Sequence, residues 1–73
     1  MNNERRKKIQ KALSLMEQAK EILEEVKEEE QDAFDNLPEG IQGSERGEQM
    51  EDNIYNLEEF IDLLSDTDTI ETM

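Results

Sequence analysis

The segment Phe34–Gly47, FDNLPEGIQGSERG, divides the chain into two parts. It contains the only proline of the chain, Pro38, and all three glycines, Gly40, Gly43 and Gly47. Proline cannot continue a helix interior, and it pushes the preceding residue out of the α region. Glycine supplies left-handed or open backbone at little cost. We therefore expect the chain to reverse direction here, so that the molecule is a helical hairpin.

The reversal is expected at about residues 37–43. Leu37 and Ile41 should close the end of the hairpin, and Ser44 is a good N-cap for a helix that follows. A small residue at Gly47 would let two backbones approach closely. The residues assigned to the turn are Leu37, Pro38, Gly40, Ile41, Gly43 and Ser44.

A single long helix is predicted before the turn, from about residue 3 to residue 36. This stretch contains no proline and no glycine. Asn2 or Asn3 can cap its start. Apolar residues recur with alternating spacings of three and four, which is typical of a coiled-coil seam. One line of the predicted seam is Ile9, Met16, Leu23, Glu30 and Leu37, and the other is Ala12, Ala19, Val26 and Ala33.

A second helix is predicted from about residue 44 to residue 65. Its apolar residues also alternate in steps of four and three, at Met50, Ile54, Leu57, Ile61 and Leu64. The following segment, residues 66–73, continues no seam and is expected to be a flexible acidic tail. The whole chain is then one unit, an antiparallel coiled-coil-like hairpin.

The first half of the long helix is the expected interface. Its apolar stripe is widest at residues 9–23, and the second helix should end before it reaches Ile9. Both features predict self-association into a four-helix bundle, or docking of another protein. The candidate interface residues are Ile9, Ala12, Leu13, Leu15, Met16, Ala19, Ile22 and Leu23.

Composition limits the possible functions. Seventy-three residues make one domain at most, and such a short chain buries little core alone. There is no cysteine for a disulfide or zinc site, and no histidine, the commonest general base. No apolar run is long enough to span a membrane, and no secretory signal begins the chain. We therefore expect a cytoplasmic protein without membrane contact.

Charge is strongly segregated. The net charge is −13, but residues 1–20 carry six basic and two acidic side chains, whereas residues 21–73 carry two basic and nineteen acidic ones. A solvated acidic surface explains most of this charge, and a face for a basic partner is the alternative. The basic block Arg5–Lys8 is expected to pair with acidic residues near the C-terminus or on a second copy, so we do not expect direct binding of nucleic acid.

The carboxylates do not form a recognisable reactive site. Catalytic carboxylates need a concave, partly desolvated site, which a two-helix hairpin lacks. The calcium-loop pattern and the lysine-containing phosphate loop are both missing. We therefore expect no enzyme activity, no metal site and no cofactor.

The string EQDAFDNLPEGIQGSERGEQME, residues 30–51, resembles the centre of small acidic helical proteins of bacterial and phage genomes. The resemblance covers about a third of the chain, and it implies a phage or prophage origin without implying an activity. Together the observations predict a non-enzymatic protein–protein interaction module. The alternatives are an inhibitor that mimics nucleic acid and a small scaffold or assembly protein.

Overall fold

The computed structural model describes all 73 residues, and it consists of helices without any strand. Two long helices, α1 (Asn3–Asp35) and α3 (Glu45–Ser65), carry most of the chain. The short helix α2 (Glu39–Gln42) lies between them, and another short helix, α4 (Asp68–Glu71), ends the chain. The prediction of an all-α protein is confirmed.

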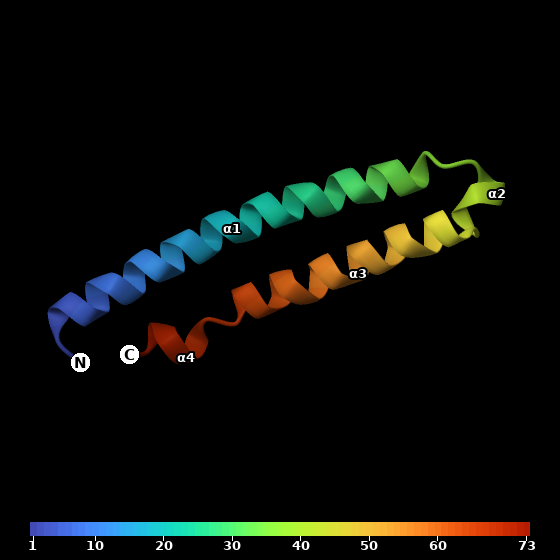
Figure 1. The fold of residues 1–73 in the computed structure, drawn as a ribbon. Coiled ribbons are helices and arrows are strands. Elements are labelled where there is room, and N and C mark those ends of the chain that lie inside the picture. Colours follow the sequence, from blue (N-terminus) through green and yellow to red (C-terminus); the bar gives the residue numbers. More distant parts are fainter.

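The helices α1 and α3 lie side by side and run in opposite directions (Figure 1). Helix α2 turns the chain at one end, and α4 returns beside the start of α1 at the other end, where both termini lie (Figure 1). The molecule is a rod of 58 × 16 × 13 Å. Its length follows from α1, since 33 residues at a rise of ~1.5 Å span about 50 Å.

Helix α1 begins with a side-chain cap. The Oδ1 atom of Asn2 accepts a hydrogen bond from the backbone N–H of Arg5 at 2.9 Å. This bond satisfies one of the donors that the first helical turn leaves free. At the other end the Nε2 atom of Gln42 donates to the carbonyl of Phe34, in the last turn of α1, and to the carbonyl of Leu37 just beyond the helix, both at 3.2 Å.

The turn differs from the expectation in two ways. None of the three glycines has a positive φ, so the reversal does not use left-handed backbone. It is made by Pro38, which precedes a single turn of helix, and by Gly43, which ends that turn in a right-handed conformation. Ile41 does not close the end of the helix pair, because its side chain is 41% exposed. The partly buried side chain of Gln42 takes that place.

Ser44 precedes α3, but its side chain does not cap the helix. Its hydroxyl donates instead to the carbonyl of Ile41, which ties α3 to the preceding turn. The close approach expected at Gly47 involves this turn rather than α1. A Cβ atom on Gly47 would lie 2.0 Å from the carbonyl oxygen of Gln42.

The seam of α1 also differs from the prediction. We write heptad positions a to g with a at Leu13 in α1 and at Gly47 in α3. Position d, with Ile9, Met16 and Leu23, is partly buried as expected. The other partly buried line is position a, and it contains Leu13, Lys20, Lys27 and Phe34. Of the predicted second line, Ala12, Ala19, Val26 and Ala33, only Ala19 is partly buried. The prediction is wrong for the others because Leu13 and Phe34 offer larger apolar surfaces, and because the aliphatic stems of the lysines can pack in a seam.

The C-terminal segment, which was expected to be a flexible acidic tail, contains a short helix. Residues 68–71 form α4, which contacts α1. The backbone N–H groups of Ile70 and Glu71 both donate to the carbonyl of Thr67, at 3.0 and 2.9 Å. The Thr67 hydroxyl also donates to the Glu71 carboxylate at 3.1 Å. These hydrogen bonds hold the short helix in place, and its one apolar residue, Ile70, lines a hollow together with residues of α1.

Candidate interaction surface

The seam between α1 and α3 buries little. Ile61, which is 7% exposed, and Gly47 are the only buried residues. All other a and d residues of both helices are partly exposed. A pair of helices can cover only the facing stripe of each helix, so the remaining apolar side chains are left at the surface.

A second apolar stripe runs along α1 at heptad positions g and c. It contains Ala12, Leu15, Ala19, Ile22, Val26 and Ala33. Leu15 is 55% exposed and Ile22 is 60% exposed, so these side chains are not part of the seam. In α3 the same positions hold two large apolar residues, Phe60 at g and Leu63 at c, which are 52% and 68% exposed.

Helical geometry places these residues on one face. At ~100° per residue, positions g and c are displaced from the seam in the same rotational sense on both helices. In an antiparallel pair, this shared sense brings position g of one helix beside position g of the other. We call positions g and c of α1 and α3 the apolar face.

The apolar face is almost free of carboxylates. Helices α1 and α3 contain seventeen acidic residues, and only one of them, Glu29, is at position g or c. The polar residues that α3 contributes are uncharged, apart from Arg46 at the end near the turn: they are Gln49, Asn53 and Asn56. Charge is therefore segregated around the rod as well as along it.

The opposite face, at positions b and e, is rich in carboxylates. We call it the acidic face, and its acidic residues are Glu17, Glu21, Glu24, Glu28, Asp35, Glu48, Glu51, Glu58 and Asp62. At its edge the Nζ atom of Lys27 lies 3.3 Å from Oε1 of Glu58, and this is the only ion pair in the structure. Both side chains are partly solvated, so the pair adds little to stability.

Tyr55 is on the acidic face. Its hydroxyl donates to Oε1 of Glu59 at 2.7 Å. This hydrogen bond, helped by the charge of the carboxylate, raises the pKa of Tyr55 above its usual value. The phenol thus stays neutral and serves as a hydrogen-bond donor along the helix.

The structure divides the eight candidate interface residues into two groups. Four are at seam positions, where they are partly buried: Ile9, Leu13, Met16 and Leu23. The other four are on the apolar face: Ala12, Leu15, Ala19 and Ile22. The sequence-based selection did not include four apolar residues of that face: Val26, Ala33, Phe60 and Leu63. Their heptad positions, g and c, could have identified them, but only after the seam had been assigned correctly.

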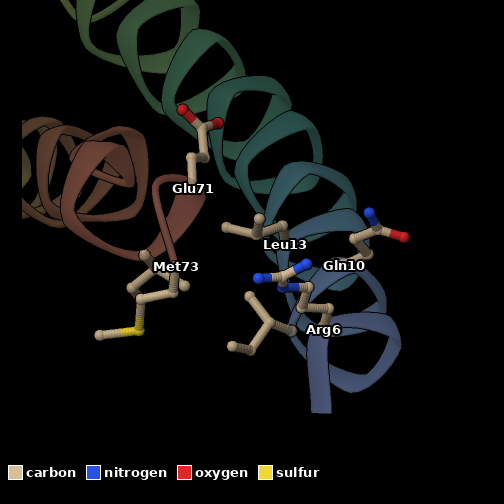
Figure 2. Close-up of a pocket in the computed structure, with 7 residues that line it drawn as sticks. Arg6, Gln10, Leu13, Glu71 and Met73 are labelled. Atoms are coloured by element: carbon tan, nitrogen blue, oxygen red, sulfur yellow. The ribbon is translucent and has the colours of Figure 1, made fainter. Parts of the chain in front are cut away.

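The start of α1 is not left uncovered, because α4 lies beside it. Figure 2 shows Arg6 and Leu13 of α1 opposite Glu71 and Met73. These residues line a hollow of about 90 Å³, together with Ile9, Gln10 and Ile70. No ion pair links the basic block Arg5–Lys8 to the C-terminal acids in this structure. These basic side chains are therefore available to another molecule.

Comparison of the chain with protein families, curated proteins and solved structures found no match. None of the helices combines the length and the apolar character that crossing a membrane requires.

Proposed function

We propose that the chain is a helical hairpin that acts as a protein–protein interaction module, and that its apolar face binds a second copy. The observation that carries this proposal is the combination of exposure and composition on one face. Leu15, Ile22, Phe60 and Leu63 are each more than half exposed. They share a surface with one carboxylate, in a chain with twenty-one.

The size of the face suits such an association. The stretch from Lys8 to Ala33 is about 38 Å long at ~1.5 Å per residue, and the rod is 16 Å wide. Complete contact over this surface would cover roughly 600 Å² on each copy, which is near the lower end of specific interfaces. It would also enlarge a core that is too thin in the single chain.

Sedimentation equilibrium tests the proposal. The variant carrying Leu15→Glu and Ile22→Glu places two carboxylates on the apolar face without touching the seam. We expect the unchanged chain to be a dimer and this variant to be a monomer with similar helicity by circular dichroism. The matched control carries Gln10→Glu and Ser14→Glu, which add the same charge at positions e and b.

Three results would contradict the proposal. A well-folded monomer of the unchanged chain at millimolar concentration would remove the need for an interface. Loss of association in the control as well would show that added charge, rather than the apolar face, is responsible. Open-ended oligomers of the unchanged chain would favour a scaffold instead.

Mimicry of nucleic acid is the second candidate, and the acidic face favours it. Carboxylates follow that face along both helices, whereas its one cation, Lys7, lies near the start of α1, and Lys27 beside it in the seam is paired with Glu58. A basic groove that neutralises phosphates could accept such a track. The chain should then displace a labelled DNA duplex from a basic DNA-binding protein. A variant with Glu24, Glu28, Glu51 and Asp62 changed to the amides should fail to displace the duplex.

A further inference from the structure

We infer that the two copies are related by a two-fold axis and run antiparallel, with α1 lying on α1 of its partner across the apolar face. This inference rests on the proposed function, because it specifies how the second copy binds. Three observations support it: the spacing of residues on α1, the order of small and large side chains, and the distribution of charge along the rod.

The stripe on α1 is symmetric about a point between Ala19 and Ile22. In the central part of the stripe, residues whose numbers add to 41 are both stripe residues, so Leu15 can meet Val26 of a partner, and Ala19 can meet Ile22. A two-fold axis through this point pairs these four residues with one another, as an isologous interface requires, and it places Ala12 against Glu29 and Ala33 against Lys8.

Side-chain size favours this direction. At the centre of an antiparallel pair, each alanine at position 19 faces an isoleucine at position 22, so a small residue fills the space beside a large one. A parallel pair would place Ala19 on Ala19 and Ile22 on Ile22, which leaves a void in one layer and crowds the next. It would also place Lys8 on Lys8 and Glu29 on Glu29.

Charge favours the same arrangement over a second possible one. Each copy could instead set its α1 on the partner's α3, with the turns at the same end. The half of the rod near the turn, residues 21–52, has thirteen acidic and two basic side chains, a net charge of −11. The other half, residues 1–20 and 53–73, has eight acidic and six basic side chains, a net charge of −2. The antiparallel arrangement of the two copies, with α1 on α1, keeps the two strongly negative halves apart.

The antiparallel arrangement also gives the basic block Arg5–Lys8 a role. Arg5 and Lys8 are on the apolar face and have no ion-pair partner within 4.0 Å in the chain. They would lie near Glu29 and Asp32 of the second copy. Leu63, the most exposed of the large apolar side chains, would be close to the two-fold axis. The Lys27–Glu58 pair indicates this position. Because the two helices are antiparallel, residue 63, five positions after Glu58, lies near the level of residue 22, five positions before Lys27.

Cysteine cross-linking tests the direction, since the chain has no cysteine of its own. Two single variants, Leu15→Cys and Val26→Cys, are oxidised separately and as an equal mixture. Within one chain these positions are about 16 Å apart at ~1.5 Å per residue, too far for a disulfide. We expect a covalent dimer from the mixture and none from either variant alone. A mixture of Ser14→Cys and Glu28→Cys, on the acidic face, should remain unlinked.

The outcomes separate this inference from the proposed function. Cross-linking of Leu15→Cys with itself, or of Ile22→Cys with Leu63→Cys in preference to the first mixture, would show that the copies meet in another orientation. The inference would then be wrong, and the proposed function would stand. Absence of every cross-link from a chain that sediments as a monomer would overturn both. Absence of every cross-link from a chain that sediments as a dimer would place the interface on another surface.

A charge exchange provides an independent readout. Lys8→Glu should weaken dimerisation roughly three- to ten-fold, because each change occurs twice in the dimer. Glu29→Lys should have a similar effect, and the variant with both changes should regain most of the affinity. If the two effects simply add without recovery, Lys8 and Glu29 are not neighbours across the interface.

Discussion

Gly47 shows how a single residue can decide the geometry of the turn. In most helix positions glycine is less favourable than alanine by ~1 kcal/mol. Here a side chain would meet the backbone of the preceding turn, because a Cβ atom would lie 2.0 Å from the carbonyl oxygen and 2.6 Å from the carbonyl carbon of Gln42. Both atoms belong to the backbone, so a rotamer change cannot relieve the contact.

Gly47→Ala should therefore destabilise the protein despite the better helix propensity of alanine. We expect a loss of about 1–3 kcal/mol in the free energy of unfolding, which is the usual cost of overpacking. Urea denaturation followed by circular dichroism measures it. Gly43→Ala is the matched control: its Cβ would have no neighbour within 4 Å, so its stability should be unchanged or slightly higher. Equal effects of the two changes would show that the approach at Gly47 is not as close as described.

Tyr55 gives a pH-dependent signal from one residue. Its folded-state pKa is raised by the hydrogen bond to Glu59 and by the charge of that carboxylate. A pKa raised on folding means that the stabilisation is complete below the unfolded-state pKa, and that it is lost as the pH rises through the folded-state value. The contribution of this bond to helix stability should thus disappear only at strongly alkaline pH.

An absorbance titration of Tyr55, the only tyrosine in a chain without tryptophan, measures this shift. We expect a midpoint above ~10, the usual value for tyrosine, and a lower midpoint in Glu59→Ala. Glu51→Ala removes an equal charge one helical turn on the other side of Tyr55, and it should leave the midpoint almost unchanged. A midpoint that falls equally in both variants would assign the shift to general negative charge instead of the hydrogen bond.

At the scale of elements, α1 depends on the two short helices at its ends. Gln42 of α2 donates to the carbonyl of Phe34 in the last turn of α1 and to the carbonyl of Leu37 just beyond it, so α2 is tied to the end of the long helix. Ile70 of α4 and Met73, which follows α4, line the hollow that also includes Ile9 and Leu13. The long helix is thus supported beyond the reach of α3.

Removal of residues 68–73 should loosen the start of α1 without unfolding the rest. Ile9 and Leu13 would lose their apolar neighbours, at a cost of about 1–2 kcal/mol for the partial burial involved. Hydrogen exchange should become faster for the amides of residues 7–14, whereas those of residues 20–30 should be unaffected. Substitution of Asp68 and Thr69 by alanine, which removes no apolar contact, is the control. Unchanged exchange at residues 7–14 after the truncation would mean that α4 does not protect α1.

At the scale of the whole molecule, repulsion between like charges opposes the compact state. The net charge of −13 is concentrated near the turn, where residues 21–52 carry −11. Only one ion pair within 4.0 Å offsets this repulsion. Dissolved ions screen such exposed charges over a distance of about 8–10 Å at moderate salt.

The melting temperature should therefore rise by several degrees between 20 mM and 500 mM sodium chloride. Neutral sucrose at matched osmolality controls for effects that do not depend on ionic strength. A variant in which Glu24, Glu25 and Glu28 are changed to glutamine should melt at a higher temperature than the unchanged chain at low salt, and it should respond less to salt. A melting temperature that falls as salt is added would show that attractive ion pairs dominate.

The helical class and the place of the turn could be predicted without any knowledge of the tertiary structure. Two long segments free of proline and glycine, with apolar residues three and four apart, favour helices whatever the rest of the chain does. Pro38 interrupts them because its ring cannot fit a helix interior, and this constraint is local. The cap at Asn2 was predictable for the same reason.

The tertiary structure alone decided which side of α1 faces α3. Apolar residues lie on both sides of the line through Ile9, Met16 and Leu23. Residue hydrophobicity alone therefore predicts Ala12 and Val26 in the seam in preference to Lys20 and Lys27. Packing depends on the size of the side chains and on the reach of aliphatic stems, so Leu13, Phe34 and the two lysines occupy the seam. That choice exposes Leu15, Ile22 and Val26, and it brings Phe60 and Leu63 to the same face. The surface proposed to bind a second copy is therefore a consequence of how two helices pack, and pairwise packing of distant residues is not contained in the pattern of either helix alone.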